Sequence, residues 1–313
     1  MLNMQEVKAV LNALRNMDLE TVTIDEIKGQ LFLLHDHVAT RRTFPKNTVI
    51  CRSVLMKEDD DVFISESRIS YKKDAKGMDF GRATYEDRSA FYGCLNTEII
   101  QSSMTSALEI LPMSKKDTAR YNLVCGKWII EEDLELLFLG GSDNLIHLCD
   151  EGLERHNFLF DSIKNDHENI IILKLIDSFI CNEFSKKVEE SKPWEYKISA
   201  CYAEMMKDLG EAGLVFPSVA ANGAGLNIVL FPDSVDNGLI KLEYAAYGTF
   251  YNRNGEYVRE YSMEAFNDMG LLRWREFYTQ VLHGSIKKYY TGLSEHNPLE
   301  NTSTVDLGAR RIN

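Results

Sequence analysis

The hydrophobic period changes between residues 199 and 231, and this change constrains the fold more than any other feature of the sequence. Apolar side chains recur at helical spacing from Ser199 to Leu209, and the helix should end near Gly210 or Gly213. The segments LVF and NIVLF then have the composition of two short strands joined by a glycine-rich turn. The length of 313 residues allows either about two domains or one elaborated α+β domain, so length alone does not decide the domain organisation.

Two amphipathic helices are expected near the start of the chain. The first follows from apolar residues at i, i+3, i+4 and i+7, namely Val7, Val10, Leu11 and Leu14. The second begins at a capping box formed by Thr23 and Glu26, and its apolar stripe runs to Val38. His35 and His37 lie two residues apart, so they point to different helix faces and do not form a metal-ligand pair.

A strand with one unusual charge is predicted over residues 48–55. Its period of two places Arg52 on the same face as Ile50 and Val54. A buried guanidinium costs several kcal/mol unless it meets an anion or hydrogen-bond acceptors. Arg52 therefore needs an internal carboxylate or a ligand phosphate, and the residues alone favour the carboxylate.

The remaining segments give coarser expectations. Residues 57–76 are polar and predict a loop or weak hairpin, and residues 129–192 read as helices with one apolar run. Asn254 and Gly255 predict the turn of a β-hairpin. A C-terminal helix is then expected from an apolar stripe formed by Trp274, Phe277, Tyr278 and Val281. The polar residues 293–313 predict a loose tail.

Composition excludes several function classes. The formal net charge is -13, from 35 basic and 48 acidic residues, whereas nucleic-acid binding needs a basic stripe. The six cysteines are widely spaced, without a CxxC pair or zinc-ligand spacing, so we expect reduced thiols and no metal. The N-terminal residues lack a signal-peptide core, and the most apolar run, residues 170–180, is too short to span a membrane. We therefore expect a cytoplasmic protein without a membrane anchor.

A first group of chemically interesting residues lies between positions 81 and 110. Arg82 follows a glycine in a turn, Tyr92 lies ten residues later, and Glu109 lies on a predicted helix. Arg82 could grip a phosphate with both guanidinium nitrogens, Tyr92 could stack on a planar ring, and Glu109 could face a developing positive charge. On the residues alone, surface roles for Arg82 and Glu109 and a core role for Tyr92 are favoured.

A second group, from Tyr196 to Phe231, shifts this balance because its order resembles the C-terminal half of the RES domain. The positions that carry the resemblance are Tyr196, Ser199, Gly213, Ser218, Gly225, Asn227 and Phe231. The N-terminal half of that domain is matched, in order, by Arg52, Gly81-Arg82, Tyr92 and Ala107-Leu108-Glu109. The resemblance extends over residues 44–231 in separated blocks.

The resemblance implies a fold and a domain division. The fold would be an ADP-ribosyltransferase-like split β-sheet with surrounding helices, and with extra helices at both ends. Residues 1–43 would be a helical extension, 44–235 the RES domain with a helical insertion around 129–192, 236–292 a hairpin and helix, and 293–313 the tail.

The resemblance also implies an activity, namely cleavage of the bond between nicotinamide and ribose in NAD, without a metal. Arg52, Tyr92 and Glu109 would be catalytic, with Glu109 beneath the ribose. The NAD-binding residues would be Arg52, Arg82, Tyr92, Ser218 and Asn227. Water as acceptor gives an NAD glycohydrolase, phosphate an NAD phosphorylase, and a protein or nucleotide an ADP-ribosyltransferase.

The resemblance also implies a biological role, and the sequence differs from the usual RES pattern at two places. Many RES proteins are bacterial toxins that arrest growth and are neutralised by a helix-turn-helix antitoxin, and the extra helices could instead mediate homo-oligomerisation. Ala83 and Thr84 replace the usual aromatic residue and Asn, and the spacing from Tyr92 to Glu109 is longer than usual. Glu98 is therefore a rival to Glu109, and a catalytically silent binding module is the alternative from a different class.

Overall fold

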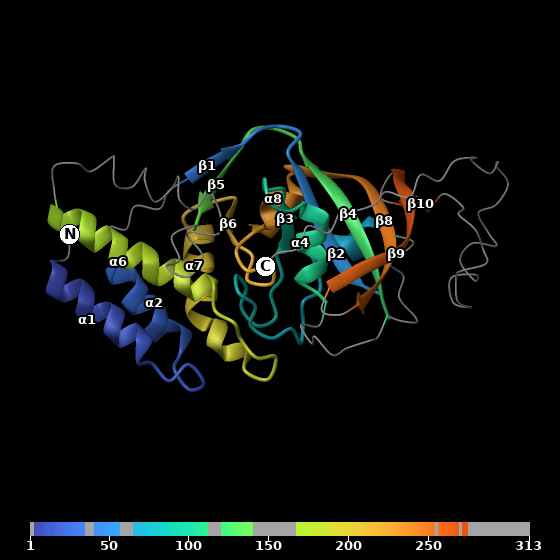
Figure 1. Ribbon diagram of the computed structural model, residues 1–313. Helices are drawn as coiled ribbons and strands as arrows, with labels where there is room; N and C mark the ends of the chain where they lie inside the picture. The colour runs from blue at the N-terminus through green and yellow to red at the C-terminus, as the bar shows by residue number, and fades with distance from the viewer. Residues whose placement is uncertain are drawn as a thin grey trace.

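The computed structural model describes residues 3–34, 41–56, 65–111, 120–139, 167–253, 256–268 and 271–274. Within them, ten strands form one mixed sheet in the order β1-β5-β6-β7-β3-β2-β4-β8-β9-β10 (Figure 1). All neighbouring strands are antiparallel except β5 and β6. The strands are β1 (Arg41–Phe44), β2 (Val49–Leu55), β3 (Phe91–Leu95), β4 (Arg120–Ile130), β5 (Leu134–Phe138), β6 (Gly213–Pro217), β7 (Leu226–Leu230), β8 (Ile240–Arg253), β9 (Glu256–Asp268) and β10 (Leu271–Trp274).

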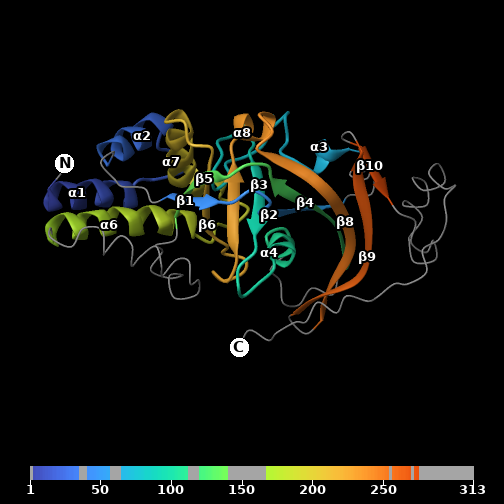
Figure 2. The same cartoon turned by 90° about the horizontal axis from the view of Figure 1, so that it is seen from above.

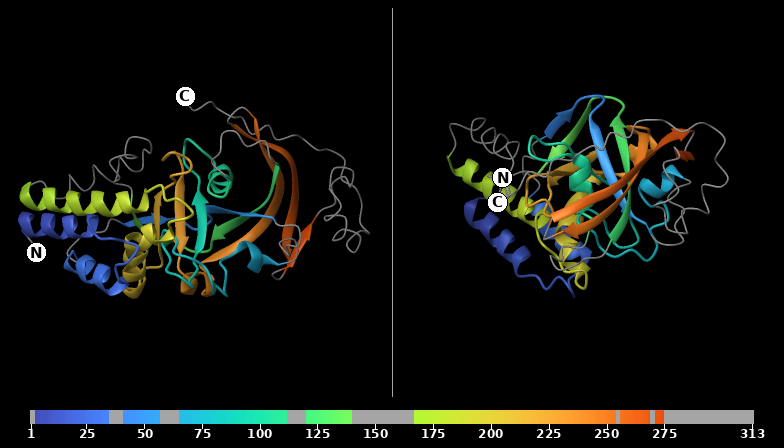
Figure 3. Two further views of the ribbon diagram at one scale, coloured as in Figure 1. Left: turned by 90° about the horizontal axis from the view of Figure 1, so that it is seen from below. Right: turned by 45° about the vertical axis from the view of Figure 1, so that its right-hand side comes forward.

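Helices gather at one end of the sheet, where α1, α2, α6 and α7 lie together, while β8 and β9 curve around the other end (Figure 2). Their bounds are α1 (Met4–Arg15), α2 (Ile24–Leu33), α3 (Glu66–Ile69), α4 (Ser102–Leu108), α6 (His167–Phe184), the 3-10 helix η2 (Pro193–Tyr196), α7 (Lys197–Asp208) and α8 (Pro232–Asp236). Helix α4 is separate from this group and lies on the concave side of the curved strands (Figure 3). The fold is thus a mixed α+β fold in which the helices pack around a single sheet.

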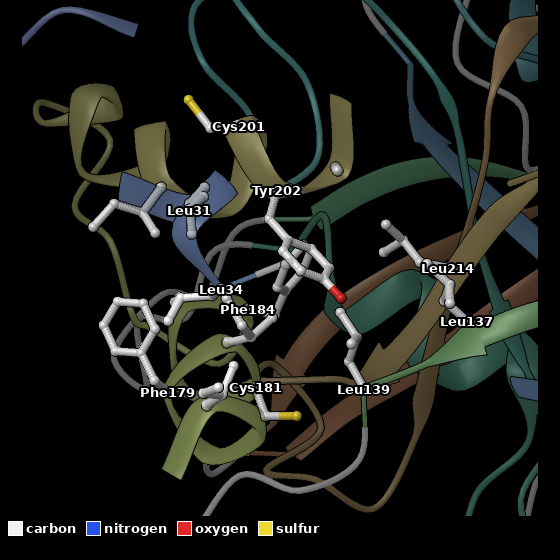
Figure 4. Packing of buried hydrophobic residues seen from close by; sticks show 14 of the residues in the cluster. Leu31, Leu34, Leu137, Leu139, Phe179, Cys181, Phe184, Cys201, Tyr202 and Leu214 are labelled. Atoms are coloured by element: carbon white, nitrogen blue, oxygen red, sulfur yellow. The ribbon is translucent and has the colours of Figure 1, made fainter. Parts of the chain in front are cut away.

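Two hydrophobic clusters cover the two faces of the central strands. One contains Phe91 and Trp128, whose rings meet edge to face with centroids 5.0 Å apart. The other joins the N-terminal helices to α6, α7 and the opposite face of the sheet, and Figure 4 shows Leu31, Phe184 and Tyr202 within it. Because β6 and β7 are buried at every position, their residues do not alternate between polar and apolar, and Asn227 is the one polar side chain in these two strands.

Strands β2 and β3 diverge soon after they meet. Their only paired residues are Ile50 with Leu95 and Cys51 with Cys94. Strand β2 nevertheless pairs with β4 along its whole length, from Val49 to Leu55. The two halves of the sheet therefore separate beyond Cys51, and Arg52 is the first residue of β2 past this point.

Several predicted elements are confirmed. Val7, Val10, Leu11 and Leu14 are buried on α1, and the capping box of α2 is present, with Thr23 and Glu26 bonded in both directions. The strands around residues 48–55, 213–217 and 226–230 and the helix near 199–209 are also present. Residues 253 and 256 are opposite each other across β8 and β9, as the predicted hairpin requires.

Other predictions are wrong in detail. Residues 134–138, expected within a helical insertion, form β5 because a short apolar run fits a buried strand as well as a helix. Glu66–Ile69 is a short helix rather than part of a loop or hairpin, and the strand β1 was not predicted. Leu209, expected in the apolar stripe of α7, is 74% exposed because it caps the end of the helix.

The C-terminal predictions fall mostly outside the described residues. Trp274 was expected on a C-terminal helix, but it is the last residue of strand β10, so this part of the prediction is wrong. Phe277, Tyr278, Val281 and the tail 293–313 lie outside the described residues, as do His35, His37 and Val38. Within the described residues, no helix has the length and apolar character needed to cross a membrane.

Candidate active site

Glu109 lies at the C-terminal cap of α4, and this helix is fixed firmly against the sheet. Its buried residues are all small, among them Ser106, whose hydroxyl lies 2.7 Å from that of Ser53 on β2. Thr105 approaches the turn before β7 so closely that a Cβ on Gly225 would lie 2.5 Å from the Thr105 Oγ1. Glycine at 225 therefore allows α4 to lie near this turn.

The carboxylate of Glu109 accepts two hydrogen bonds through one oxygen. Ser218 Oγ donates to Glu109 Oε1 at 2.5 Å, and Asn227 Nδ2 donates to the same atom at 2.8 Å. Both donors are buried, at 0% and 1% exposure respectively. In the described part of the chain, the second carboxylate oxygen has no hydrogen bond, so it remains available to a ligand.

Asn227 connects Glu109 to Tyr92. Its Nδ2 also donates to the Tyr92 hydroxyl oxygen at 2.8 Å, while its Oδ1 accepts from the Cys94 thiol at 3.3 Å. Cys94 and Asn227 are opposite each other across β3 and β7, which places both side chains on one face of the sheet. The amide orientation is thereby determined by three neighbours.

Tyr92 is held at its ring as well as at its hydroxyl. The ring meets Phe216 edge to face, with centroids 5.9 Å apart. Burial, followed by the nearby charge of Glu109, raises the pKa of Tyr92 well above its ordinary value. The phenol is therefore protonated at neutral pH and retains a proton that it can donate.

Ser218 is positioned by the turn that follows β6. Its backbone N–H donates to the Gly225 carbonyl at 2.8 Å, and its Oγ accepts from the Ala221 N–H at 3.0 Å. Asn222 and Gly223 take positive φ values of 49° and 82°, which Asn and Gly tolerate best. The turn therefore leaves the Ser218 hydroxyl hydrogen for Glu109.

Arg52 makes no ion pair with a carboxylate among the described residues. Its Nε donates to the Ser70 carbonyl at 3.1 Å, and its Nη1 donates to the Tyr92 carbonyl at 2.6 Å across the opening between β2 and β3. Burial, with a smaller effect of Arg68, lowers the pKa of Arg52 to about 10. Among the described residues, main-chain oxygens thus take the place of the internal carboxylate that the sequence favoured, and no carboxylate there compensates the positive charge.

Arg82 is likewise without a carboxylate partner in the described part of the chain. It lies in a tight turn in which Gly81 and Thr84 exchange backbone hydrogen bonds. Its Nη1 donates to the Phe184 carbonyl at 2.5 Å, and its Nη2 donates to the Tyr196 hydroxyl at 3.4 Å. Its charge acts on Tyr92, where it opposes the rise in pKa.

The structure therefore brings Tyr92, Glu109, Ser218 and Asn227 into one hydrogen-bonded cluster, with Arg82 near Tyr92. Arg52 contacts the cluster only through the Tyr92 main chain. Glu98, the rival carboxylate, is exposed in the segment between β3 and α4, and no hydrogen bond or ion pair of the described residues joins it to this cluster.

Two contributors to the site were not predicted as such. Cys94 orients Asn227, and its position two residues after Tyr92 on one strand was the available signal, because such residues share a face. Tyr196 contacts Arg82, although the sequence marked it only as part of the resemblance. Among the described residues, no group of three His, Cys, Asp or Glu side chains is placed to hold a metal ion.

The chain matches no protein-family model, and no curated protein matches it at a significant level.

Proposed function

We propose that this protein consumes NAD by cleaving the bond between nicotinamide and ribose, as a glycohydrolase or phosphorylase. One observation carries the proposal. The Glu109 carboxylate is oriented by two buried donors and has one oxygen without a hydrogen bond among the described residues. The Arg82 guanidinium, which has no carboxylate partner among these residues, acts on Tyr92 in the same cluster. In such a site the fixed carboxylate can stabilise the positive charge that develops on the ribose. The guanidinium can bind the diphosphate that is joined to this ribose.

Glu109 would stabilise the charge that develops during cleavage. When the ribose C–N bond breaks, its electron pair leaves with nicotinamide as a neutral base, and the ribose carbon becomes an oxocarbenium-like cation. A carboxylate already fixed by Ser218 and Asn227 needs no reorganisation to face that cation. Water would then add to the carbon and lose a proton, whereas phosphate as acceptor would give a sugar phosphate.

The two arginines would bind the diphosphate. Guanidinium groups match paired phosphate oxygens, and an uncompensated buried guanidinium gains most from an arriving anion. The charge of Arg82 acts on Tyr92, and Arg52 lies at the opening between β2 and β3. In this proposal Tyr92 stacks on nicotinamide, and Ser218 and Asn227 line the pocket beside the nicotinamide ribose.

The fold is compatible with this assignment. Strands β2 and β3 share only two residue pairs before they diverge, which is the kind of opening expected in the split sheet of an ADP-ribosyltransferase-like fold. Together with the ordered resemblance to the RES domain, this supports a bacterial growth-arresting toxin that acts in the cytoplasm. A helix-turn-helix antitoxin would be its partner.

The test is nicotinamide release from NAD by the purified protein, with and without phosphate. We expect release by the native chain and a fall of at least about 100-fold in kcat for Glu109→Gln, with an unchanged melting curve. Glu98→Gln removes an exposed carboxylate outside the cluster and serves as the matched control, with turnover close to native.

The products then identify the acceptor. ADP-ribose indicates water, and its phosphorylated form indicates phosphate. Label transfer from NAD to a macromolecule would instead indicate an ADP-ribosyltransferase. A native chain that neither releases nicotinamide nor transfers label would favour a silent binding module.

A further inference from the structure

Two elements outside the cluster hold the guanidinium of Arg82. The Phe184 carbonyl, at the C-terminus of α6, accepts from Nη1 at 2.5 Å, and the Tyr196 hydroxyl lies 3.4 Å from Nη2. The Tyr196 ring also lies beneath the guanidinium, whose central carbon is 5.1 Å from the ring centroid. None of these groups is an anion, so together they orient the guanidinium without neutralising it.

Each supporting group is itself fixed. The Tyr196 carbonyl accepts from the Ser199 hydroxyl at 3.1 Å, and the next residue, Lys197, donates to the carbonyls of Glu20 and Val22 at 3.3 and 3.0 Å. These contacts fix the junction between η2 and α7 against the segment that leads into α2. A ring at position 196 therefore has a defined place before any ligand arrives.

The Phe184 carbonyl is suited to a cation because it belongs to the last turn of α6. Carbonyls there lack intrahelical donors, and the helix dipole places partial negative charge at this end. The Phe184 ring is fully buried and packs against Phe216, at 5.1 Å between centroids, and Phe216 in turn contacts the Tyr92 ring. The support of Arg82 is thus continuous with the packing of the proposed site.

We infer that Tyr196, together with the C-terminus of α6, is a positioning device that presents Arg82 to the diphosphate of a nucleotide. The inference rests on the proposed function, since NAD supplies the diphosphate. Two guanidinium N–H groups are used by protein contacts, and the others remain for phosphate oxygens. Tyr196 acts through Arg82 and is not itself placed against the reacting atoms.

A purely structural role predicts different behaviour. If Arg82 only joined the 81–84 turn to α6, loss of the Tyr196 ring would lower stability and weaken every ligand alike. A positioning role instead changes KM for ligands that carry a diphosphate and leaves kcat nearly unaltered, because binding energy is lost equally in the ground state and transition state.

The test compares Tyr196→Leu and Tyr196→Phe in steady-state kinetics with NAD. Loss of the ring face should raise KM by about 5- to 20-fold with kcat within about threefold, which corresponds to a typical cation–π contribution. Tyr196→Phe keeps the ring and should raise KM by no more than about twofold, as the hydroxyl contact is long. Nicotinamide riboside, which lacks the diphosphate, should be cleaved equally by all three proteins.

A double-mutant cycle makes the inference falsifiable. In an Arg82→Ala background, Tyr196→Leu should cause no further rise in KM. An equal rise in both backgrounds, or weaker cleavage of nicotinamide riboside, would overturn the positioning role while leaving the proposed function intact. If the native chain does not act on NAD at all, the proposed function fails and this inference fails with it. Should Tyr196→Leu not fold, Tyr196→Met provides the same comparison, since it fills similar volume without a ring face.

Discussion

The Arg52 guanidinium is hydrogen-bonded to main-chain oxygens, yet it has no carboxylate partner among the described residues. Its donors reach the carbonyls of Ser70 and Tyr92, yet burial lowers its pKa to about 10. Because this folded value lies below the ordinary value of 12.5, Arg52 is still charged in the folded state below about pH 10, and carrying that charge lowers the stability of the fold there. An anionic ligand would relieve that cost.

Arg52→Ala should therefore have a small effect on stability and a large effect on affinity. We expect the melting temperature to change by no more than about 3 °C, since loss of two hydrogen bonds is offset by removal of an uncompensated charge. The dissociation constant for NAD, measured by calorimetry, should rise at least about 10-fold. Arg41→Ala removes an exposed arginine that pairs with Glu211, so it is the control that leaves affinity unchanged. Large destabilisation with native affinity would remove Arg52 from the site.

At the scale of elements, α4 determines where Glu109 lies. Helix α4 packs so closely against the turn before β7 that no side chain fits at Gly225. A Cβ on Gly225 would meet Thr105 Oγ1 at 2.5 Å and Cγ2 at 2.6 Å. Real Cβ atoms do not approach other atoms so closely, so the Thr105 side chain or the helix that carries it would have to shift. The hydrogen bonds from Ser218 and Asn227 to Glu109 depend on that position.

Gly225→Ala should displace α4 and lower turnover by at least about 10-fold, with a loss of about 1 to 3 kcal/mol in the free energy of unfolding. Thr105→Ala in the same chain removes both clashing atoms and should restore part of the activity. Gly29→Ala, in α2, meets no atom within 4 Å and serves as the control, with native turnover and equal or greater stability. Turnover is measured as kcat, and the free energy of unfolding is measured by urea denaturation. Native turnover in Gly225→Ala would show that catalysis does not depend on the position of α4.

The elements that sequence could predict are those with one clear period. The α1 stripe and the Thr23 capping box were sufficient for the N-terminal helices, because each pattern specifies a local structure. Strands β1 and β5 were missed, since four or five residues are too few to separate a strand from a buried helical turn. Pairing between β1 and β5 depends on contacts about 90 residues apart, which no local pattern contains.

The candidate site was predictable only in part and for a different reason. Periodicity placed Tyr92 on a strand and Glu109 near a helix, but it could not bring them to Asn227, which lies more than 100 residues from both in sequence. Their grouping came from the resemblance. The contacts of Tyr196 and Phe184 with Arg82 join three segments, and no sequence pattern indicated them.

At the scale of the whole molecule, buried thiols and phenols make stability sensitive to alkaline pH. Burial raises the pKa of Cys94 well above its ordinary value and that of Cys201 to about 11, and it likewise raises the pKa of Tyr92. Groups with raised folded pKa values keep their protons in the folded state after the unfolded state has lost them. They contribute stability below the unfolded pKa, and that stability is lost as pH rises.

The free energy of unfolding should therefore fall from about pH 9 upward, by up to about 1.4 kcal/mol per pH unit for each thiol. Urea denaturation at pH 7.5, 9 and 10 measures this slope. Cys201→Ala should make the slope shallower between pH 9 and 10, whereas substitution of an exposed residue such as Glu98→Gln should not change it. A slope that is flat over this range in the native chain would contradict the assignment of buried, protonated thiols.

The strand order has a consequence for how the sheet can open. Five strand-to-strand steps separate β1 from β2, about 24 Å if the sheet were flat, yet the chain from Phe44 to Val49 spans at most about 18 Å. The link from Ile130 to Leu134 covers the same number of steps with about 14 Å of chain. These two links are short straps that force the sheet to curl and tie its halves together at one end. The two links lie at the end of the sheet where Ile50 and Cys51 of β2 pair with β3. Separation of the two halves is therefore confined to the opposite end of β2, and it begins at Arg52.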